Sequence, residues 1–501
     1  MAGNPHLDFP GAYNLSNPVI LVNSVGERQN LALGIIAELN IYEDIHSNAV
    51  TGSIHIMDAY NLISNDSLQG NERLIFKLST PGTKNDRVDI VDASEETGYP
   101  FHIYALTDRQ QISETVMSYT LHFCSKELLR NVRTKVSRAY SGGLAESVVD
   151  ILRDKDGLNS RKDIYYEQTR NSDKVVIPNL RPFDAVNLIS KRALSKNATG
   201  AGYYFYETTK GFHFRSYESM LAYKSRYARK EMVLLSYTPK TLGSATNRKF
   251  NNQHSIESYE FMQHFDTLAQ QAVGTYANRV ITHNMYDKSY DITDYHYHNL
   301  FPSMFHTDNV SKGSKSNYPI SDTPVDIDPK EGSQPGDKTV SDYPESVVSL
   351  QSSTRFLHND DTGVFGTSTN SEGLTEGIRL SQRNQVRNST RVKIVMPGHS
   401  YLQAGDVIHF QLPSLEPNKQ TQHGYQFDEY HSGRYLISKL RHRVVQGQYK
   451  MILECIKDSV YRKHTNLSNE SFPGKQSPIG KTQDIYRLDE FHLGSQMGPH
   501  R

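Results

Sequence analysis

The chain has 501 residues, with 55 Lys and Arg balanced by 55 Asp and Glu, so its formal net charge is zero. This length exceeds one ordinary core and suggests roughly three or four domains. A protein that reads duplex DNA usually carries a basic excess, so the balance argues against sequence-specific nucleic-acid binding. No run approaches the roughly 18 apolar residues of a membrane-spanning helix, which argues against stable membrane insertion.

The two cysteines, Cys124 and Cys455, lie far apart in the sequence, each on the apolar side of an expected strand. Buried free thiols fit this pattern better than a disulfide, so we expect assembly in a reducing cytoplasm. The N-terminal residues show no charged segment followed by an apolar run, and we expect no signal peptide. The 31 tyrosines are typical both of protein interfaces and of β-rich folds, and both interpretations stay open.

The region 15–124 predicts an antiparallel β domain. Apolar and polar residues alternate in five segments separated by turn signals, which is typical of a barrel or sandwich. One such segment places Met117, Tyr119, Leu121 and Phe123 on the same side of a strand.

The next region begins with a helical pattern over 125–138. Leu129, Val132 and Val136 recur at helical spacing, so we expect them to form its apolar face. The same segment contains five basic residues, namely Lys126, Arg130, Arg133, Lys135 and Arg138. These predict either a basic surface for an acidic partner or DNA, or a solvated helix surface, and solvation is the simpler interpretation.

Residues 178–217 predict a helix followed by a hairpin. Pro182 suits a first helical turn, and Phe183 begins the apolar stripe of that helix. Two aromatic segments then flank a turn that ends at Gly211, and Phe214 belongs to the second of them. Core packing explains these aromatic residues better than a cofactor site does.

The pattern of strands and a helix returns after residue 231, with an amphipathic helix expected to include Phe261, Phe265 and Leu268. Residues 309–377 differ because they are polar and rich in Pro, Gly and Ser, and such a segment cannot fold alone. It is either a flexible excursion or an arm that orders against a neighbouring subunit. The tail 463–501 has the same character.

Four short strands are predicted over 391–460. Val392, Ile394 and Met396 alternate with polar residues, and Tyr449 to Cys455 alternate in the last strand. The two middle strands lie in the motifs PGHSYLQAGDVIHFQLPS and SGRYLISKLRH. The last strand ends in KDS.

These motifs, in this spacing, resemble the closing domain of baseplate central hub proteins of contractile-tail phages, a family related to VgrG-type hubs. The segment DAYNLIS and the helix–hairpin unit are similar to earlier parts of the same family. The positions that carry the resemblance are Pro182, Phe183, Gly211, Phe214, Pro397, Gly398, Gly405, Asp406, Gly433, Tyr435 and His442.

The resemblance implies a mainly β fold with α+β elements: two tube-like antiparallel β-barrel or sandwich domains, a small helix–hairpin domain and long loop insertions. The corresponding boundaries are 1–124 for the first tube-like domain, 125–230 for the intermediate domain, 231–308 and 378–462 for the second tube-like domain, 309–377 for the insertion and 463–501 for the tail.

The resemblance also implies a structural role in the virion. Three chains would form a pseudo-sixfold ring that joins the sixfold tail tube to the threefold central spike and leaves a lumen for DNA. The implied partners are two further copies, the tail tube protein, the central spike protein, the tape-measure protein and the baseplate wedge proteins. A tail-associated cell-wall hydrolase and a VgrG-like hub of a secretion or injection system are the alternatives.

Signatures of enzymes are lacking in the sequence: it contains no GxSxG, Walker, HExxH, GxGxxG or CxxC motif. The nearest metal-like spacing is His296 and His298, which one strand face could present together, with His283 nearby in sequence. No third ligand is placed by a motif, so we expect no metal, no cofactor and no catalytic residues.

Overall fold

The structure is a computed structural model, and it is mainly β. It describes residues 9–16, 18–23, 25–63, 68–81, 90–96, 99–170, 172–196, 200–222, 234–237, 255–285, 288–307, 318–319, 338–352, 358–359, 372–413, 420–421, 424–425, 428, 430–445, 447–460 and 493–496. The predicted fold class is confirmed, because the described chain forms several antiparallel sheets and only a few helices. The tail 463–501 lies outside the described residues except for 493–496.

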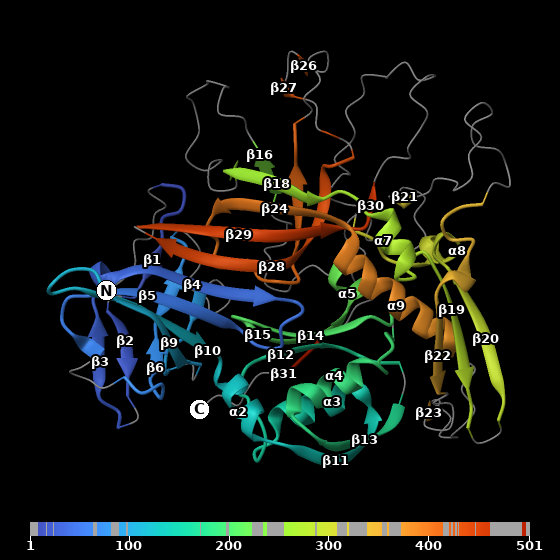
Figure 1. Cartoon of the computed structure of the whole chain (residues 1–501), viewed down its shortest axis with the longest axis horizontal. Coiled ribbons are helices and arrows are strands. Elements are labelled where there is room, and N and C mark those ends of the chain that lie inside the picture. Colours follow the sequence, from blue (N-terminus) through green and yellow to red (C-terminus); the bar gives the residue numbers. More distant parts are fainter. Residues whose placement is uncertain are drawn as a thin grey trace.

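The first β module forms one half of a long sheet, at the blue end of Figure 1. Its strands run in the order β4-β5-β10-β9-β6-β2-β3. Their bounds are β2 (Val19–Val22), β3 (Arg28–Leu31), β4 (Ile36–Asp44), β5 (Thr51–Asp58), β6 (Arg73–Ile75), β9 (Phe101–Gln111) and β10 (Met117–Cys124). A small sheet of β1 (Asn14–Leu15), β7 (Lys77–Ser79) and β8 (Ile90–Asp92) lies beside it, and η1 (Leu33–Ile35) leads into β4.

The second β module closes on itself. β28 pairs with β25 and β29, β29 with β24, β24 with β18, and β16 joins β25 to β17, which directly precedes β18. The bounds are β16 (Leu234–Tyr237), β17 (Ser255–Ile256), β18 (Ser258–Gln263), β24 (Thr390–Pro397), β25 (Val407–Gln411), β28 (Gly433–Val445) and β29 (Gln448–Lys457). The alternation predicted for β24 and β29 is confirmed, because Val392, Ile394, Met396 and Leu453 are all fully buried.

The two β modules share one sheet. β4 pairs antiparallel with β28, from Asp44 opposite Lys439 to Glu38 opposite Val445. Across this seam the Glu38 carboxylate binds the guanidinium groups of Arg441 at 2.8 Å and Arg443 at 2.9 Å. A single apolar core then runs through both modules, so their relative position is fixed by main-chain hydrogen bonds and packing together.

The intermediate unit lies against both modules. Its bounds are α2 (Lys126–Arg133), β11 (Val136–Gly143), α3 (Leu144–Arg153), β12 (Ile164–Glu167), β13 (Ser172–Leu180), α4 (Pro182–Ser190), β14 (Tyr203–Thr208), β15 (Gly211–Ser216) and α5 (Tyr217–Ala222). The helix and the hairpin predicted over 178–217 are confirmed as α4 and β14–β15. The aromatic core prediction also holds, because Phe183 and Phe214 belong to one buried cluster.

A lateral unit lies at the other end of the molecule, where α9 crosses one face of the sheet β20-β19-β22 (Figure 1). Its bounds are α7 (Thr267–Ala272), β19 (Ala277–His283), β20 (Tyr290–His296), α8 (Tyr297–Leu300), η2 (Phe301–Ser303), η3 (Pro344–Ser346), β22 (Val348–Ser352) and α9 (Glu372–Asn388). The remaining short strands are β21 (Tyr318–Pro319), β23 (His358–Asn359), β26 (Gln420–Thr421), β27 (Gly424–Tyr425), β30 (Ser459–Val460) and β31 (Leu493–Gln496). Among the described residues, no helix combines the length and apolar character that a membrane span requires.

The polar segment 309–377 contributes to this lateral unit. β22 pairs in parallel with β19, and α9 begins at Glu372. The segment need not fold alone, because β19 supplies the hydrogen-bonding edge and α9 covers the sheet. Residues 320–337 and 360–371 lie outside the described residues. The domain boundaries therefore stay predictions.

Two helix predictions are wrong. Phe261 lies in strand β18, and the helix α7 begins only at Thr267, because the β24 edge offers a partner that periodicity in the sequence cannot reveal. In α2 the predicted apolar face points outward: Leu129 is 37% and Val132 56% exposed, whereas Glu127 and Asn131 are buried. Val136 is buried, but in strand β11.

Candidate functional site at the junction of three units

The loop 398–406, between β24 and β25, lies where the two β modules and the hairpin β14–β15 meet. Gly398 begins it and packs on the ring of Tyr449 in β29. A Cβ atom at Gly398 would lie 2.2 Å from that ring, so any other residue would displace the tyrosine. The Gly398 N–H also donates to the Tyr449 carbonyl at 2.8 Å, which fixes where the loop leaves the second module.

Gly405 brings this loop against the hairpin. Its φ is +87°, and a Cβ atom there would lie 2.1 Å from the hydroxyl oxygen of Tyr206 in β14. The Gly405 N–H donates to the carbonyl of Ile437 at 2.9 Å, and the next residue, Asp406, accepts from the Ile437 N–H at 2.8 Å. The Gly-Asp pair of the sequence motif is therefore a turn that hydrogen-bonds to β28 and makes room for Tyr206.

A buried carboxylate, Glu43 in β4, joins all three units. Its two oxygens accept the Thr209 N–H of the hairpin at 2.7 Å and the Ala404 N–H of the loop at 2.9 Å. The Nε2 atom of His442 in β28 lies 4.0 Å away. Burial raises the pKa of Glu43 and lowers the pKa of His442 to about 3. No sequence motif predicts a role for Glu43, and the only signal is a charged residue that alternates with the apolar Ile41 and Ile45.

Further hydrogen bonds tie the tip of the hairpin to the loop and to the first module. Lys210 donates to the carbonyl oxygens of Ile90 at 2.8 Å and Ser400 at 3.1 Å. The Thr208 hydroxyl donates to the Gln403 side chain at 3.0 Å. Because each of these bonds crosses between units, the hairpin holds the two modules at a fixed spacing.

The hairpin also takes part in an ionic cluster of the intermediate unit, which a hydrogen bond connects to the first module. Lys162 lies between two buried carboxylates, Glu207 of β14 and Glu127 of α2, with its Nζ atom 3.2 Å from the Glu127 oxygen and in direct contact with Glu207. Glu207 also accepts the Ser125 hydroxyl at 2.6 Å and the Val50 N–H at 2.9 Å. This cluster therefore connects the first module, α2 and the hairpin.

The two carboxylates of this cluster differ in their protonation equilibria. Burial is the largest influence on Glu207, and it raises the pKa of that carboxyl. Burial also opposes ionisation of Glu127, but the Lys162 ammonium and a hydrogen bond from Ser160 outweigh it and lower the pKa of Glu127. The two carboxylates raise the pKa of Lys162 despite its burial, so the lysine stays charged.

The other positions of the resemblance serve local structure. Tyr435 is buried and donates its hydroxyl to the His431 carbonyl at 2.7 Å, and Gly433 begins β28 with a φ of +128°. Gly211 has a φ of +147°, and a Cβ atom there would lie 2.3 Å from the Asp163 carbonyl oxygen. Pro182 is the first residue of α4.

The structure thus separates the motif positions into two groups. Gly398, Gly405, Asp406 and His442 come together at the junction, with Pro397 ending the strand that leads into the loop. Phe183 lies apart, in α4, where its N–H donates to the side-chain oxygen of Asn131 at 2.8 Å.

The metal candidates do not share a strand face. His296 ends β20, whereas His298 lies in α8 because the helix begins at Tyr297. Their Nδ1 atoms face the segment 339–341: His296 lies 2.8 Å from the Ser341 carbonyl, and His298 lies 2.9 Å from the Ser341 hydroxyl. His283 is at the opposite end of the β19–β20 hairpin. Within the described part of the chain, no group of three or more His, Cys, Asp or Glu side chains could hold a metal ion.

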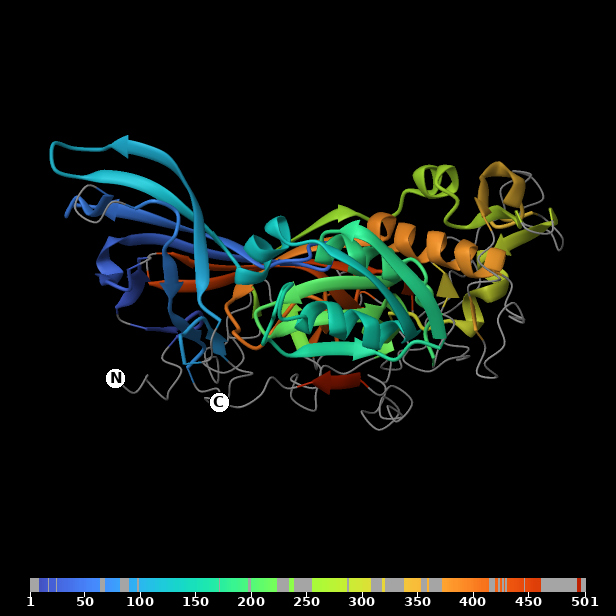
Figure 2. The same cartoon turned by 90° about the horizontal axis from the view of Figure 1, so that it is seen from below.

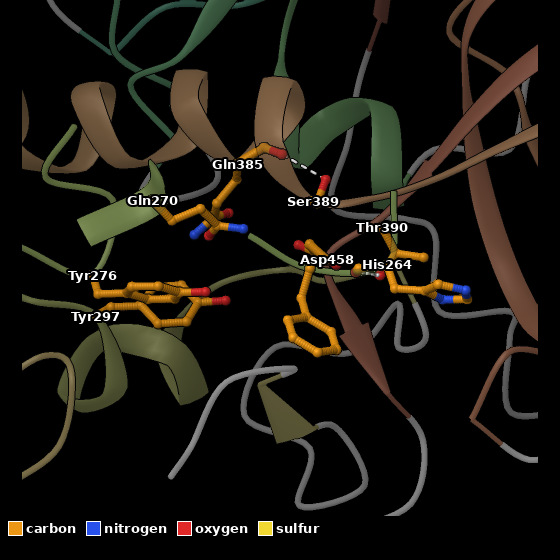
Figure 3. Close-up of a pocket in the computed structure, with 9 residues that line it drawn as sticks. His264, Gln270, Tyr276, Tyr297, Gln385, Ser389, Thr390 and Asp458 are labelled. Atoms are coloured by element: carbon orange, nitrogen blue, oxygen red, sulfur yellow. Dashed lines mark hydrogen bonds between the residues drawn. The ribbon is translucent and has the colours of Figure 1, made fainter. Parts of the chain in front are cut away.

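A small cavity lies between α7, α9 and the residue that follows β29 (Figure 3). Gln270, Tyr297, Gln385 and Asp458 are among the residues that line it, and its volume is about 20 Å³. This is room for one water molecule, because a water needs at least roughly 10–15 Å³. The Asp458 carboxylate is held by Thr307 and His306, with the His306 Nδ1 atom 3.1 Å away, so the cavity belongs to a buried structural network.

No protein-family model matches the chain, and neither does any curated protein sequence. Among solved structures, the chain is similar to a tail protein from Neisseria meningitidis, with 11% identity, a TM-score of 0.47, and coverage of 89% of this chain and 97% of that chain. It is also similar to a 43 kDa tail protein of prophage MuSo2 from Shewanella oneidensis, with 8% identity, a TM-score of 0.46, and coverage of 88% and 98%. A type VI secretion system component from E. coli gives 10% identity, a TM-score of 0.39, and coverage of 90% and 79%.

Proposed function

We propose that the chain is a structural hub at the base of a contractile phage tail. In this role three copies form a ring that joins the sixfold tail tube to the threefold central spike and leaves a lumen for DNA. The observation that carries the proposal is the β4–β28 pairing, which unites two β modules of one chain in one sheet. The sequence motifs of 391–460 support the same role through their resemblance to phage hub proteins.

The pairing matters because a symmetry adaptor needs two similar modules per chain at a fixed spacing. Three copies of such a chain present six modules, so a threefold ring can meet a sixfold tube. A flexible linker would let the modules drift, whereas here a shared sheet, a common core and the junction at Glu43 hold them together.

The partners proposed for this ring are the tail tube protein above it, the central spike protein below it, the tape-measure protein in its lumen and the baseplate wedge proteins around it. The chain would act in the virion, after assembly in the host cytoplasm. Its work would be binding and force transmission, with no chemical step at the junction.

The mass of the purified chain in solution tests this proposal, together with class averages of the particles by electron microscopy. We expect a threefold particle, alone or with the spike protein added. A stable monomer under both conditions contradicts the proposal. Lysis of purified cell walls by the same sample would instead identify a tail-associated hydrolase.

A further inference from the structure

The outward face of α2 is unusual because it exposes two apolar residues, while two polar residues of the same helix are buried. Glu127 and Asn131 point inward, where Glu127 joins the Lys162 cluster and Asn131 accepts the N–H of Phe183 at the start of α4. Leu129 and Val132 are left exposed between two exposed cations, Lys126 and Arg133. We call these four residues the α2 surface. A helix that directs polar residues inward and apolar residues outward is typical of one that covers a partner.

A second exposed apolar area lies on the sheet β20-β19-β22, on the face opposite α9. Ile292, Ile281 and Leu350 stand side by side across the three strands, with Val348 next to Leu350 on the same face. Ile292 is 50% and Leu350 73% exposed. We call these four residues the three-strand surface. The other face of the same sheet is covered, because Gly377 of α9 lies against Asn278 and Tyr295.

One end of the three-strand surface is negative, whereas the α2 surface is positive. At one end of the three-strand surface, Asp294 pairs with Arg279 at 2.6 Å, and the exposed Glu345 lies 4.0 Å from the same guanidinium. Two carboxylates against one guanidinium leave one negative charge at this end, whereas Lys288 lies at the opposite, turn end. The α2 surface carries two positive charges, since the acidic residue of that helix is buried and paired. Opposite rims around apolar centres are the arrangement of a specific protein interface.

One copy of the chain cannot bring these surfaces together. α2 and the β19–β20–β22 sheet lie apart along the long axis in both views (Figure 1 and Figure 2). A contact between two different surfaces, repeated from copy to copy, gives a head-to-tail interface, and such an interface forms a closed ring when its rotation closes.

We propose that the α2 surface of one copy docks on the three-strand surface of the next copy. This interface rests on the proposed ring, and it goes further by stating which two faces meet. Leu129 and Val132 pack on Ile281, Ile292 and Leu350, while Arg133 lies toward Glu345. The basic segment around α2 then has a protein partner and is not merely a solvated surface.

Charge reversal tests the polar part of the interface. Arg133→Glu and Glu345→Arg should each weaken self-association of the full chain about tenfold, as measured by analytical ultracentrifugation, because each places like charges together. The double variant should recover most of the loss, since the pair is restored in reversed order. A double variant as weak as the sum of the singles contradicts the proposal. Val25→Ser, at an exposed loop position of the first module, is the control and should associate like the parent.

Crosslinking tests the geometry directly. The natural thiols of Cys124 and Cys455 are buried, so Val132→Cys and Leu350→Cys each add one reactive thiol. A short bismaleimide should link the two variants when they are mixed and should link neither variant to itself. Self-linking of Val132→Cys alone would mean that α2 meets α2 and would overturn the proposal.

Different results would overturn the interface and the hub function. A parent chain that forms threefold rings, with no crosslink in the mixture and no response to charge reversal, overturns this interface and leaves the hub function standing. A parent chain that stays monomeric, even with the spike protein, contradicts both.

Discussion

The hairpin β14–β15 is held by two contacts that are built in opposite ways. At the loop 398–406 the contact relies on absent side chains and on main-chain groups: Gly405 admits Tyr206, and Glu43 binds two backbone N–H groups. At Lys162 the contact relies on three buried charges from distant parts of the chain. The first fixes a shape, whereas the second fixes a charge balance, so the two should respond differently to substitution and to pH.

The largest effect should come from breaking the charge balance. Lys162→Met leaves Glu127 and Glu207 buried without their cation, and we expect it to cost about 3–5 kcal/mol in the free energy of unfolding. Urea unfolding measures this cost. Lys77→Met is the matched control, because Lys77 pairs with Glu96 at 3.0 Å on an exposed surface, and it should cost at most about 1 kcal/mol. Equal losses in the two variants would mean that the buried cluster stabilises the fold no more than an exposed ion pair does.

The contrast between the two contacts also explains what the sequence reveals. The glycines of the loop lie in one short motif, so the turn and its need for glycine could be predicted from neighbouring residues. The charged cluster joins positions 127, 162 and 207, and no local pattern connects them. For the same reason, periodicity places the apolar stripe of α2 on the wrong side. The partner that draws Glu127 inward is Lys162, which lies 35 positions later in the chain.

The shape of the loop contact is tested by Gly405→Ala. Both a positive φ and the Tyr206 hydroxyl oppose the new methyl group. Gly447→Ala is the control, since Gly447 has a φ of +79° and no atom within 4 Å of a new Cβ. We expect the control to lose about 1–2 kcal/mol in the free energy of unfolding from backbone strain alone. Gly405→Ala should lose about 1–3 kcal/mol more from steric overlap.

Adding Tyr206→Phe to Gly405→Ala should recover part of that loss, because it removes the overlapping hydroxyl. Thermal unfolding of the parent, Gly405→Ala, Gly447→Ala and the double variant measures the difference in stability. No recovery would indicate that backbone strain, and not the contact with the hairpin, explains the need for glycine at 405.

The charge contact should show a pH dependence of opposite sign at its two carboxylates. Glu127 has a lowered pKa, so its stabilising effect is present above the ordinary carboxyl pKa and is lost as the pH falls through the folded value. The stability difference between the parent and Glu127→Gln should therefore narrow on acidification. Glu207 has a raised pKa, so its contribution is largest at low pH and is lost as the pH rises through the folded value.

For Glu207→Gln, the stability difference from the parent should therefore change with pH in the opposite direction to that of Glu127→Gln. Each single group can change the stability by at most about 1.4 kcal/mol per pH unit. Urea unfolding of the three proteins between neutral and acid pH tests this. Parallel curves for the two variants would contradict the assignment of opposite shifts.

The smallest effect is expected at the seam between β4 and β28. Glu38→Gln removes the ion pairs with Arg441 and Arg443, which are partly exposed, so we expect a loss of about 0–1 kcal/mol. Main-chain pairing and the common core should hold the modules together without this carboxylate. Differential scanning calorimetry measures the loss of stability in Glu38→Gln. A loss as large as that of Lys162→Met would mean that the seam depends on charge.

The measurement that tests the central claim most directly is a cryo-electron microscopy reconstruction of the chain assembled with its spike partner. Our account predicts a threefold ring in which the first and second β modules alternate around the axis, so that six similar modules face the tube. A ring in which only one module per copy faces the tube, or a particle with a single copy, would contradict it.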